Sequence, residues 1–377
     1  MADEISVLIV DDSALMRNLI SKMIESTPGL VVAEKAMNGI FALQKIPRVN
    51  PDVIVLDLEM PEMNGIEFLK ERKKQGIKIP VVILSSIARR GAEITMEALA
   101  LGASDFIQKP SGSVSEDIHT VKDTLVGMLL GYGGQYRRLQ GKKVLAPGEY
   151  PKKPEVPEAA VTDIHKIFPV AAAPAKPPVP IRKPGNIEVI AIGISTGGPD
   201  ALRVVFSKLD ADLKQPILVV QHMPAGFTME FARSLDRLCP LDVKEAEEGD
   251  AVQQGRVLIT PGNKHMEVER KGSGTVVHLS ESPPVNGHRP SADVLFASVA
   301  LAYQNRALGV IMTGMGRDGA QQLGTIYKEG GITLGQDEAS AVVYGMPRVA
   351  YELGHVMEQV SLEKMAERIC AAAKAQR

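Results

Sequence analysis

Short runs rich in β-branched residues alternate with helical patterns along most of this 377-residue chain. In the first third, the strand-like runs are ISVLIV, LVVAEKA, DVIVLD, PVVILS and SDFIQ. Helical patterns such as residues 13–27 and 91–102 lie between them. Strands that alternate with helices predict a parallel sheet with helices on both faces, the doubly wound α/β architecture.

The same alternation returns after a proline-rich gap. Residues 141–185 contain ten prolines, a composition that favours an extended linker over a packed core. Beyond the gap, the runs IEVIAIG, PILVVQ, RALGVIMTG and ITLGQ are again strand-like, and an antiparallel hairpin is predicted over 256–280 and a helix over 361–375. The sequence therefore predicts two α/β domains, over 1–130 and 187–377, joined by a linker over 131–186.

Composition excludes several classes of protein. The formal net charge is −2, so no overall field favours nucleic acid or an anionic membrane surface. The two cysteines, Cys239 and Cys370, cannot form a disulfide framework and lack metal-ligand spacing. The start, MADEISVLIVDD, is acidic where a secretory signal is basic, and no stretch approaches the length of a membrane span. We expect a cytoplasmic protein.

Charged and polar residues follow the predicted strands of the first domain. Asp11 and Asp12 follow the first strand, Asp57 ends the third, Ser85 ends the fourth, and Lys109 follows the fifth. Ligands of doubly wound sheets bind beyond these carboxyl ends, so the side chains are expected to converge. Three carboxylates at one edge repel one another unless a cation joins them, and oxygen ligands suit Mg²⁺. The lysine and the hydroxyl would then neutralise a phosphoryl group on Asp57.

The alternative for this edge is a helix cap. Asp12 and Ser13 can cap the helix that follows, but a cap accounts for one acid and leaves the other carboxylates and the lysine unexplained. The motifs VDDSALMR, LDLEMPEMNG, ILSS and IQKP, in this order and spacing, resemble the response-regulator receiver domain over about residues 1–130.

The resemblance implies a flavodoxin-like receiver and a role for each matching residue. Asp57 would accept the phosphoryl group, and Phe106 is a candidate rotameric switch. Ser85 and Lys109 would contact the phosphoryl oxygens. The implied Mg²⁺ ligands are Asp11, Asp12, Asp57 and the backbone carbonyl of Glu59.

In the second domain, the stretch GISTGGP around Ser195 allows three interpretations: a nucleophile, a phosphate cradle or a tight turn. The cradle lacks the lysine of a P-loop and the glycine spacing of a dinucleotide site. A nucleophilic serine needs a base and an orienting acid. His222 and Asp318 each follow a predicted strand, so both can meet Ser195 at one edge of the sheet. Nearby glycines and the helix starting near Gly197 would stabilise an oxyanion.

Each partner also has a structural interpretation. His222 alone could be a structural histidine and Asp318 a turn residue, whereas together with Ser195 they favour a triad. The pattern Gly-x-Ser-x-Gly matches the nucleophile elbow of α/β-hydrolases. That fold orders its triad serine, acid, histidine, and the different order here disfavours the assignment.

Six further motifs carry a second resemblance. GISTGGP, QHMP, PGNKHMEV, HRPSADVLF, TGMGRDGA and GQDEASAVVYGMP resemble the chemotaxis protein-glutamate methylesterase family over about residues 187–358. This implies a Rossmann-like catalytic domain with Ser195 as nucleophile, His222 as general base and Asp318 as orienting acid. The amide of Met315 is implied as an oxyanion donor, and Thr196 either donates a hydrogen bond in the site or caps the helix.

The remaining histidines of these motifs receive no catalytic assignment. We expect His265, His288 and Arg289 to have structural or substrate-contact roles.

The resemblance implies a phosphorylation-activated hydrolase. It would demethylate glutamyl γ-methyl esters on cytoplasmic chemoreceptor helices through an acyl-enzyme, and deamidate receptor glutamines. A chemotaxis histidine kinase would supply the phosphoryl group with Mg²⁺, and catalysis would need no cofactor. The unphosphorylated receiver is expected to cover the catalytic edge. A regulator that only binds its partners remains the alternative; a DNA-binding regulator lacks a helix-turn-helix pattern or a basic stripe.

Overall fold

The computed structural model describes residues 3–85, 89–109, 115–144, 176–272 and 274–375. The chain divides into two compact units, Met1–Val170 and Ala171–Arg377, and each is described by itself. Ser86, Pro110 and residues 145–175, which include most of the predicted linker, lie outside the described residues.

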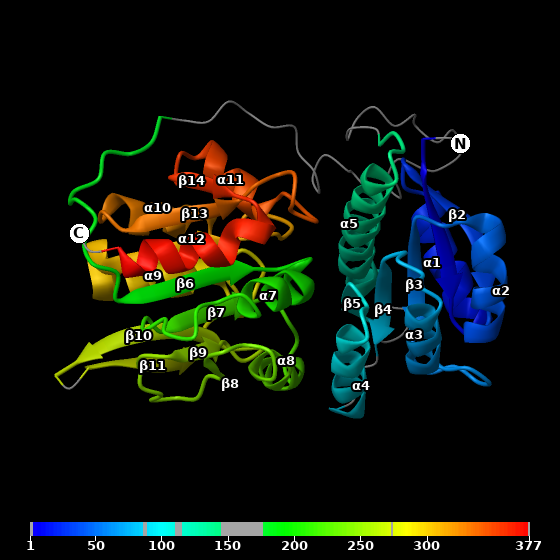
Figure 1. Ribbon diagram of the computed structural model, residues 1–377, viewed down its shortest axis with the longest axis horizontal. Coiled ribbons are helices and arrows are strands. Elements are labelled where there is room, and N and C mark those ends of the chain that lie inside the picture. Colours follow the sequence, from blue (N-terminus) through cyan, green and yellow to red (C-terminus); the bar gives the residue numbers. More distant parts are fainter. Residues whose placement is uncertain (1–2, 86–88, 110–114, 145–175, 273, 376–377) are drawn as a thin grey trace. The chain divides into compact units, whose positions relative to one another are not determined.

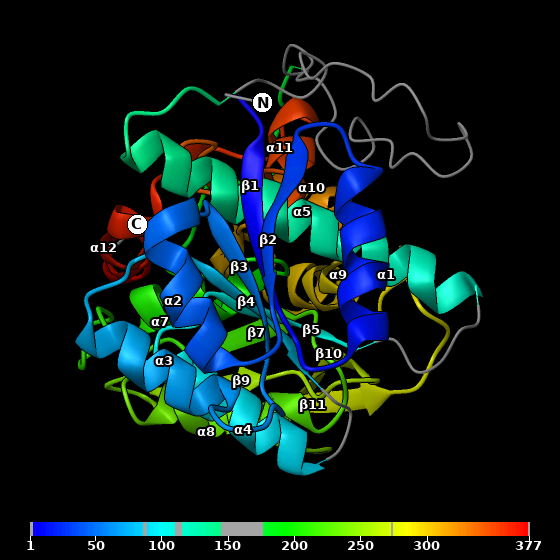
Figure 2. The ribbon, with the colours of Figure 1, turned by 90° about the vertical axis from the view of Figure 1, so that its right-hand side faces the viewer.

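The first unit contains one parallel sheet with the strand order β2-β1-β3-β4-β5 (Figures 1 and 2). The five predicted strands are confirmed as β1 (Ile5–Val10), β2 (Leu30–Ala36), β3 (Val53–Asp57), β4 (Val81–Ser85) and β5 (Asp105–Gln108). The helices are α1 (Ala14–Glu25), α2 (Gly39–Val49), α3 (Gly65–Lys74), α4 (Arg89–Ala100) and α5 (Ser115–Leu139). Figure 2 shows α1 and α5 on one face of the sheet and α2, α3 and α4 on the other. Strands β3 and β4 are buried along their whole length, as a sheet covered on both faces requires.

Helix α5 continues past residue 130, where the linker was expected to begin. Its Arg137 is buried and donates to Oδ2 of Asp52 at 3.0 Å and to the carbonyl of Glu4 at 2.8 Å. Lys142 approaches Oδ1 of Asp52 at 3.1 Å. The predicted start of the linker at residue 131 is therefore too early, because the chain after it is held by a buried ion pair.

The second unit contains a seven-stranded parallel sheet with the order β14-β13-β12-β6-β7-β9-β8. Its strands are β6 (Val189–Ile194), β7 (Ile217–Gln221), β8 (Asp242–Glu245), β9 (Arg256–Ile259), β12 (Ala307–Ile311), β13 (Ile332–Gln336) and β14 (Glu358–Val360). The helices are α7 (Gly198–Phe206), α8 (Phe227–Asp236), α9 (Ala292–Tyr303), α10 (Ala320–Lys328), α11 (Met346–Glu352) and α12 (Leu362–Lys374), with a 3₁₀ turn at Gln304–Arg306. The predicted C-terminal helix is thus confirmed as α12.

The predicted hairpin over 256–280 is only partly correct. Strands β10 (His265–Lys271) and β11 (Gly274–Ser280) form an antiparallel pair (Figure 1). The segment Arg256–Ile259 instead forms β9, which pairs in parallel with β7 and β8 inside the main sheet. Val257, Leu258 and Ile259 are all buried, which a half-exposed hairpin strand would not require.

Both sheets change winding direction at one point. In the first unit, the chain starts at β1 and proceeds to β2 on one side and to β3 on the other. In the second unit, it starts at β6 and proceeds to β7 on one side, and later to β12 on the other. Such switch points open a crevice at the carboxyl ends of the strands, where ligands bind. In the part of the chain that the structure describes, no helix is long and apolar enough to cross a membrane.

Candidate active site and acidic site

Three side chains that follow strands of the second unit meet in one hydrogen-bonded chain. Ser195 follows β6, His222 follows β7, and Asp318 lies in the loop after β12. Nδ1 of His222 lies 3.1 Å from Oγ of Ser195, and Nε2 of His222 lies 2.8 Å from Oδ2 of Asp318. Ser195 is partly exposed, whereas Asp318 is fully buried. The predicted serine, histidine and aspartate are therefore brought together at the switch point of the sheet.

The hydrogen bonds assign the tautomer of His222. A carboxylate only accepts hydrogen bonds, so Nε2 of His222 must carry the proton that it donates to Asp318. Nδ1 of the neutral ring is then an acceptor, and it faces the hydroxyl of Ser195. This arrangement allows the imidazole to take the serine proton.

Asp318 is held by an unusual number of donors, most of them from the N-terminus of α9. Oδ2 accepts from His222 and from the amide of Ala292 at 2.6 Å. Oδ1 accepts from Oγ of Ser291 at 2.6 Å, Nδ2 of Asn286 at 3.1 Å and the amide of Asp293 at 3.4 Å.

These donors keep Asp318 ionised. Burial alone would raise the pKa of Asp318, but the hydrogen bond and the charge of His222, together with the bonds from Ser291 and Ala292, hold that pKa well below its ordinary value. Asp318 therefore remains a carboxylate that can stabilise an imidazolium.

Two free amides lie beside Ser195. Among the described residues, the N–H groups of Thr196 and Met315 have no hydrogen-bond acceptor. Thr196 adjoins Ser195 in sequence, and Met315 follows Gly314, where an added Cβ would lie 2.8 Å from Cβ of Ser195. This close approach, which only glycine permits, brings the second amide near the serine. Such paired donors are what a developing oxyanion needs.

Thr196 does not cap the following helix. The N-cap of α7 is Gly197, so the capping alternative for Thr196 is wrong.

Sequence reasoning missed several residues around the triad. Gln221 is buried at the end of β7, and its Nε2 donates to the carbonyls of Ser195 at 3.0 Å and His222 at 3.2 Å. Its position directly before His222 was the only available signal. Asn286 and Ser291 hold Asp318 from a loop about thirty residues away in sequence, and no spacing pattern marks them.

The other histidine-containing motifs mainly hold that loop in place. His265 is buried, its Nδ1 accepts from the amide of Ser291 at 3.2 Å, and its Nε2 faces the carbonyl of Pro283 at 3.2 Å. Arg289 donates to Oδ1 of Asn263 and to the carbonyls of two preceding residues, Glu281 and Ser282. These contacts are structural.

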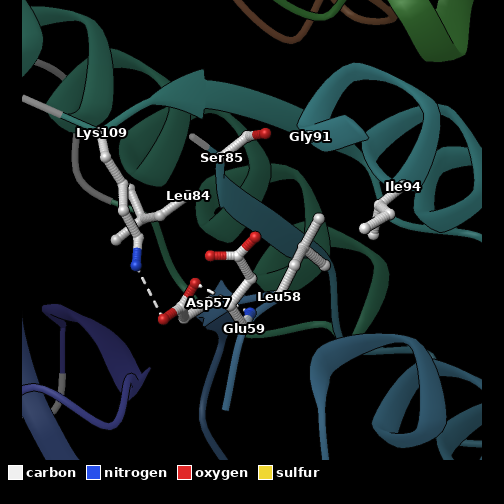
Figure 3. Close-up of a pocket in the computed structure, with 8 residues that line it drawn as sticks. All are labelled: Asp57, Leu58, Glu59, Leu84, Ser85, Gly91, Ile94 and Lys109. Carbon is white, nitrogen blue, oxygen red and sulfur yellow. Dashed lines mark hydrogen bonds and ion pairs between the residues drawn. The ribbon is translucent and has the colours of Figure 1, made fainter. Parts of the chain in front are cut away.

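The acidic site of the first unit consists of Asp11, Asp12, Asp57 and Lys109. One carboxylate oxygen from each aspartate lies within 4.8 Å of the others. Nζ of Lys109 lies 2.7 Å from Oδ2 of Asp57 and 3.5 Å from Oδ2 of Asp11. Figure 3 shows Lys109 extending from above toward Asp57, with Glu59 beside Asp57.

The two buried aspartates of this site are short of donors. Oδ1 of Asp11 accepts from the amide of Ser13, and Oδ1 of Asp57 accepts from the amide of Glu59. The buried Oδ2 atoms of Asp11 and Asp57 have no hydrogen-bond partner among the described residues apart from their ion pairs with Lys109. Burial raises the pKa of both carboxyls above its ordinary value despite Lys109.

This donor set fits a magnesium ion. Three carboxylates gathered at one point supply the hard oxygen ligands that Mg²⁺ prefers. Two of them, Asp11 and Asp57, have a buried oxygen that only Lys109 approaches, and Asp12 is exposed to solvent. Asp11, Asp12 and Asp57 would hold the ion, and the backbone amide of Glu59 contacts Asp57.

Ser85 ends β4, the strand next to β3, and also lines this pocket. Its Oγ lies 2.5 Å from Oγ1 of Thr95, which itself donates to the carbonyl of Gly91. The hydroxyl is therefore directed toward α4. Phe106 is buried on the neighbouring strand β5.

Comparisons with known proteins identify the family of each of the two units. The model of the CheB methylesterase family matches residues 190–369, and that of the response regulator receiver domain matches residues 7–120. A protein of Treponema denticola named protein-glutamate methylesterase/protein-glutamine glutaminase is 60% identical over 372 residues, covering 97% of this chain and 98% of that protein. The protein of the same name from Treponema pallidum is 54% identical over 389 residues, with 97% and 96% covered. The crystal structure of the Thermotoga maritima CheB methylesterase catalytic domain is 35% identical, covers 49% of this chain and 98% of that chain, and gives a TM-score of 0.48.

Proposed function

This chain belongs to the protein-glutamate methylesterase/protein-glutamine glutaminase family, and we propose that it hydrolyses glutamyl γ-methyl esters of chemoreceptors under the control of its receiver domain. It is a hydrolase in which a receiver precedes the catalytic domain. The observation that carries the proposal is the continuous chain from Oγ of Ser195 through both nitrogens of His222 to buried Asp318.

Acylation begins at Ser195. Its Oγ attacks the ester carbonyl carbon while Nδ1 of His222 accepts the hydroxyl proton. The carbonyl oxygen becomes an oxyanion, which the amides of Thr196 and Met315 are free to stabilise. The imidazolium then returns its proton to the departing methoxide, methanol leaves, and a glutamyl acyl-serine remains.

Deacylation repeats these steps with water. His222 removes a proton from water, which attacks the acyl carbon, and the proton returns to Oγ of Ser195 as the glutamate carboxylate is released. Asp318 accepts the Nε2–H bond throughout, which fixes the tautomer and balances the charge of the imidazolium. The same cycle deamidates glutamine when the departing group is ammonia.

The acidic site is proposed as the regulatory input. Asp57 would accept a phosphoryl group from a histidine kinase, because its Oδ2 lies toward the pocket beside Lys109. Mg²⁺, when bound by Asp11, Asp12 and Asp57, would neutralise phosphoryl oxygens during the transfer. Lys109 would pair with the phosphoryl group in place of its present pairing with the carboxylate. Phosphorylation is proposed to raise the rate of ester hydrolysis.

Methanol release from methylated receptor fragments tests the proposal. The full chain is assayed with and without a small phosphoryl donor and Mg²⁺, beside Ser195→Ala and Asp57→Asn. We expect release that the donor increases, that Ser195→Ala abolishes and that Asp57→Asn leaves at its basal rate. Release that persists in folded Ser195→Ala would refute the assigned nucleophile. No release from any fragment would favour a regulator that only binds its partners.

A further inference from the structure

The residues Val285 to His288 form a tight turn beside the triad. The amide of Val285 donates to the carbonyl of His288 at 3.0 Å, and the amide of His288 donates back at 2.9 Å. Asn286 and Gly287 both have a positive φ, 52° and 79°, as the two central residues of a type I′ turn require. The pair Asn-Gly is the strongest sequence signal for this turn. The turn therefore fixes the directions of its flanking side chains.

Two side chains of this turn contact the triad. Nδ2 of Asn286 donates to Oδ1 of Asp318. The ring of His288 stacks on the ring of His222, with 3.9 Å between their centroids and 13° between their planes. The two ring nitrogens of His288 have no hydrogen-bond partner among the described residues. The stack is thus the specific contact of this imidazole.

The stack supplies a constraint that the hydrogen bonds of His222 leave open. Ser195 and Asp318 hold the two ring nitrogens of His222, and these two bonds define an axis through the ring. The ring can still rotate about that axis. Such rotation turns the lone pair of Nδ1 away from Ser195 and the proton of Nε2 away from Asp318. A flat group packed on the face of the ring opposes this motion.

The turn that carries His288 is itself firmly held. Arg289 donates to Oδ1 of Asn263 at 3.1 Å from Nε and at 2.7 Å from its terminal nitrogen. The amide of Ser291 donates to buried His265. His288 is therefore placed by its backbone before any substrate arrives.

We propose that His288 is a positioning residue whose ring face fixes the plane of His222 and stabilises the imidazolium formed during acylation. The proposal rests on the proposed function, in which His222 is the general base. Aromatic faces attract cations, and stacked pairs add stability beyond the burial of their surfaces.

His288 remains uncharged while it acts. Burial, followed by the neighbouring His222, lowers the pKa of His288 to about 4, although Asp318 acts in the opposite direction. At neutral pH the stack therefore pairs a neutral ring with the imidazolium and avoids repulsion between two cations.

Two substitutions in the full chain separate stacking from other roles. His288→Phe keeps a flat ring and removes both nitrogens, whereas His288→Leu keeps apolar bulk and removes the ring. In methanol release, we expect kcat of His288→Leu to fall about threefold to tenfold with KM unchanged, the range that lost stacking predicts. His288→Phe should stay within about twofold of the unsubstituted chain. Val285→Ala, at the exposed start of the same turn, is the matched control and should leave kcat unchanged.

Equal losses in His288→Phe and His288→Leu would overturn the proposal, because both variants lack the nitrogens. A rise in KM with unchanged kcat would also overturn it, since it would place His288 against the substrate.

A spectroscopic measurement is independent of activity. The Nε2–H proton of His222, identified by its loss in His222→Gln, gives a downfield proton resonance while Asp318 holds it. This resonance should persist in His288→Phe and broaden in His288→Leu. An unchanged resonance in His288→Leu would refute the positioning role. Absence of Ser195-dependent methanol release from the unsubstituted chain would refute the proposed function, and the resonance would still decide whether the stack orders His222.

Discussion

Replacing Asp318 by asparagine tests the proposed mechanism most directly. Five donors surround this buried carboxylate, two on Oδ2 and three on Oδ1. An asparagine offers one acceptor oxygen and an NH₂ group, which is a donor. The NH₂ group must therefore take the place of one carboxylate oxygen and face the groups that donated to it. If the NH₂ group replaces Oδ2, His222 can bond to it only through an unprotonated Nε2. The proton then sits on Nδ1, and the ring can no longer accept from Ser195.

If the NH₂ group replaces Oδ1 instead, the hydroxyl of Ser291 can rotate to accept, but the amide donors of Asn286 and Asp293 lose their acceptor. Each buried donor left without a partner costs about 1–3 kcal/mol. Either orientation leaves one buried backbone amide, that of Ala292 or that of Asp293, without its acceptor, whereas exposed Asn286 can turn to water. The free energy of unfolding therefore falls by about 1–3 kcal/mol. The lost carboxylate charge leaves the imidazolium without its partner in both cases.

We expect Asp318→Asn to lower kcat of methanol release by about 10³-fold to 10⁴-fold, the loss typical when the orienting acid of a serine hydrolase triad becomes an amide. Asp293→Asn is the matched control. It alters a buried carboxyl that bonds Asn286 and the amide of Gln322 but does not touch His222, so kcat should stay within about tenfold. A folded Asp318→Asn chain with nearly normal kcat would refute the role of Asp318.

The pH dependence of stability has a defined sign for Asp318. Its pKa in the folded chain lies below the ordinary value of 3.8, so the unfolded chain binds its proton more readily. The stabilisation is fully present above that unfolded value and is lost as the pH falls below it. Urea unfolding of Asp318→Asn should lack this part of the acid sensitivity.

Three further perturbations test other parts of the structure. In Gly198→Ala, the new methyl group clashes with the side-chain amide of Gln221 and should displace that amide from the carbonyls of Ser195 and His222. We expect the free energy of unfolding to fall by about 1–3 kcal/mol and kcat to fall as well. An unchanged melting temperature would contradict this. Asp52→Asn should lower the free energy of unfolding by roughly 3 kcal/mol, because it leaves buried Arg137 without its carboxylate. Burial raises the pKa of Asp52, but its hydrogen bonds together lower that pKa below its ordinary value, so the difference in urea unfolding should shrink as the pH falls below about 4. A difference that is equal at pH 7 and pH 3 would contradict this. Mg²⁺ at about a hundredfold excess over its dissociation constant should stabilise the receiver by about 2.7 kcal/mol at pH 7. The raised pKa values of the two buried carboxyls should weaken this effect as the solution is made acidic. Calorimetry of Asp12→Asn should reveal a smaller shift, and an equal shift in that variant would exclude Asp12 as a ligand.

The sequence predicted the sheets and the positions of the chemistry because one rule governs both. Side chains that follow parallel strands gather at one edge, so Ser195 and His222 could be paired without any knowledge of the loops. The same reasoning misplaced residues 256–259. The apolar run at 257–259 is typical of a strand buried on both faces, whereas the proline and glycine at 261–262 favour the turn of a hairpin. At these residues, the apolar pattern was a better guide to the structure than the turn residues that follow it.

The support of the triad could not be predicted in the same way. Asn286, His288 and Ser291 act from one loop, and their contacts depend on the backbone conformation of that loop rather than on strand order. The Asn-Gly pair predicts a turn, but it does not predict which strand end the turn will face. Likewise, the helical pattern of α5 does not show where the first domain ends. The contact that holds the end of α5 joins Arg137 to Asp52, which lies 85 residues away in sequence.

The two sites use buried carboxylates in opposite ways, each at the carboxyl edge of a parallel sheet. Asp318 receives five donors, so its charge is satisfied by the protein and its pKa lies low, and it has no remaining need for a cation. Asp11 and Asp57 each receive one backbone donor and share one lysine, so burial dominates and their pKa values lie high. A carboxylate that the protein satisfies can orient a histidine permanently. A carboxylate with too few hydrogen-bond donors is stabilised by any added positive charge. The acidic site would therefore respond to Mg²⁺ and to phosphorylation. The number of donors around each aspartate thus accounts for why one edge suits catalysis and the other suits regulation.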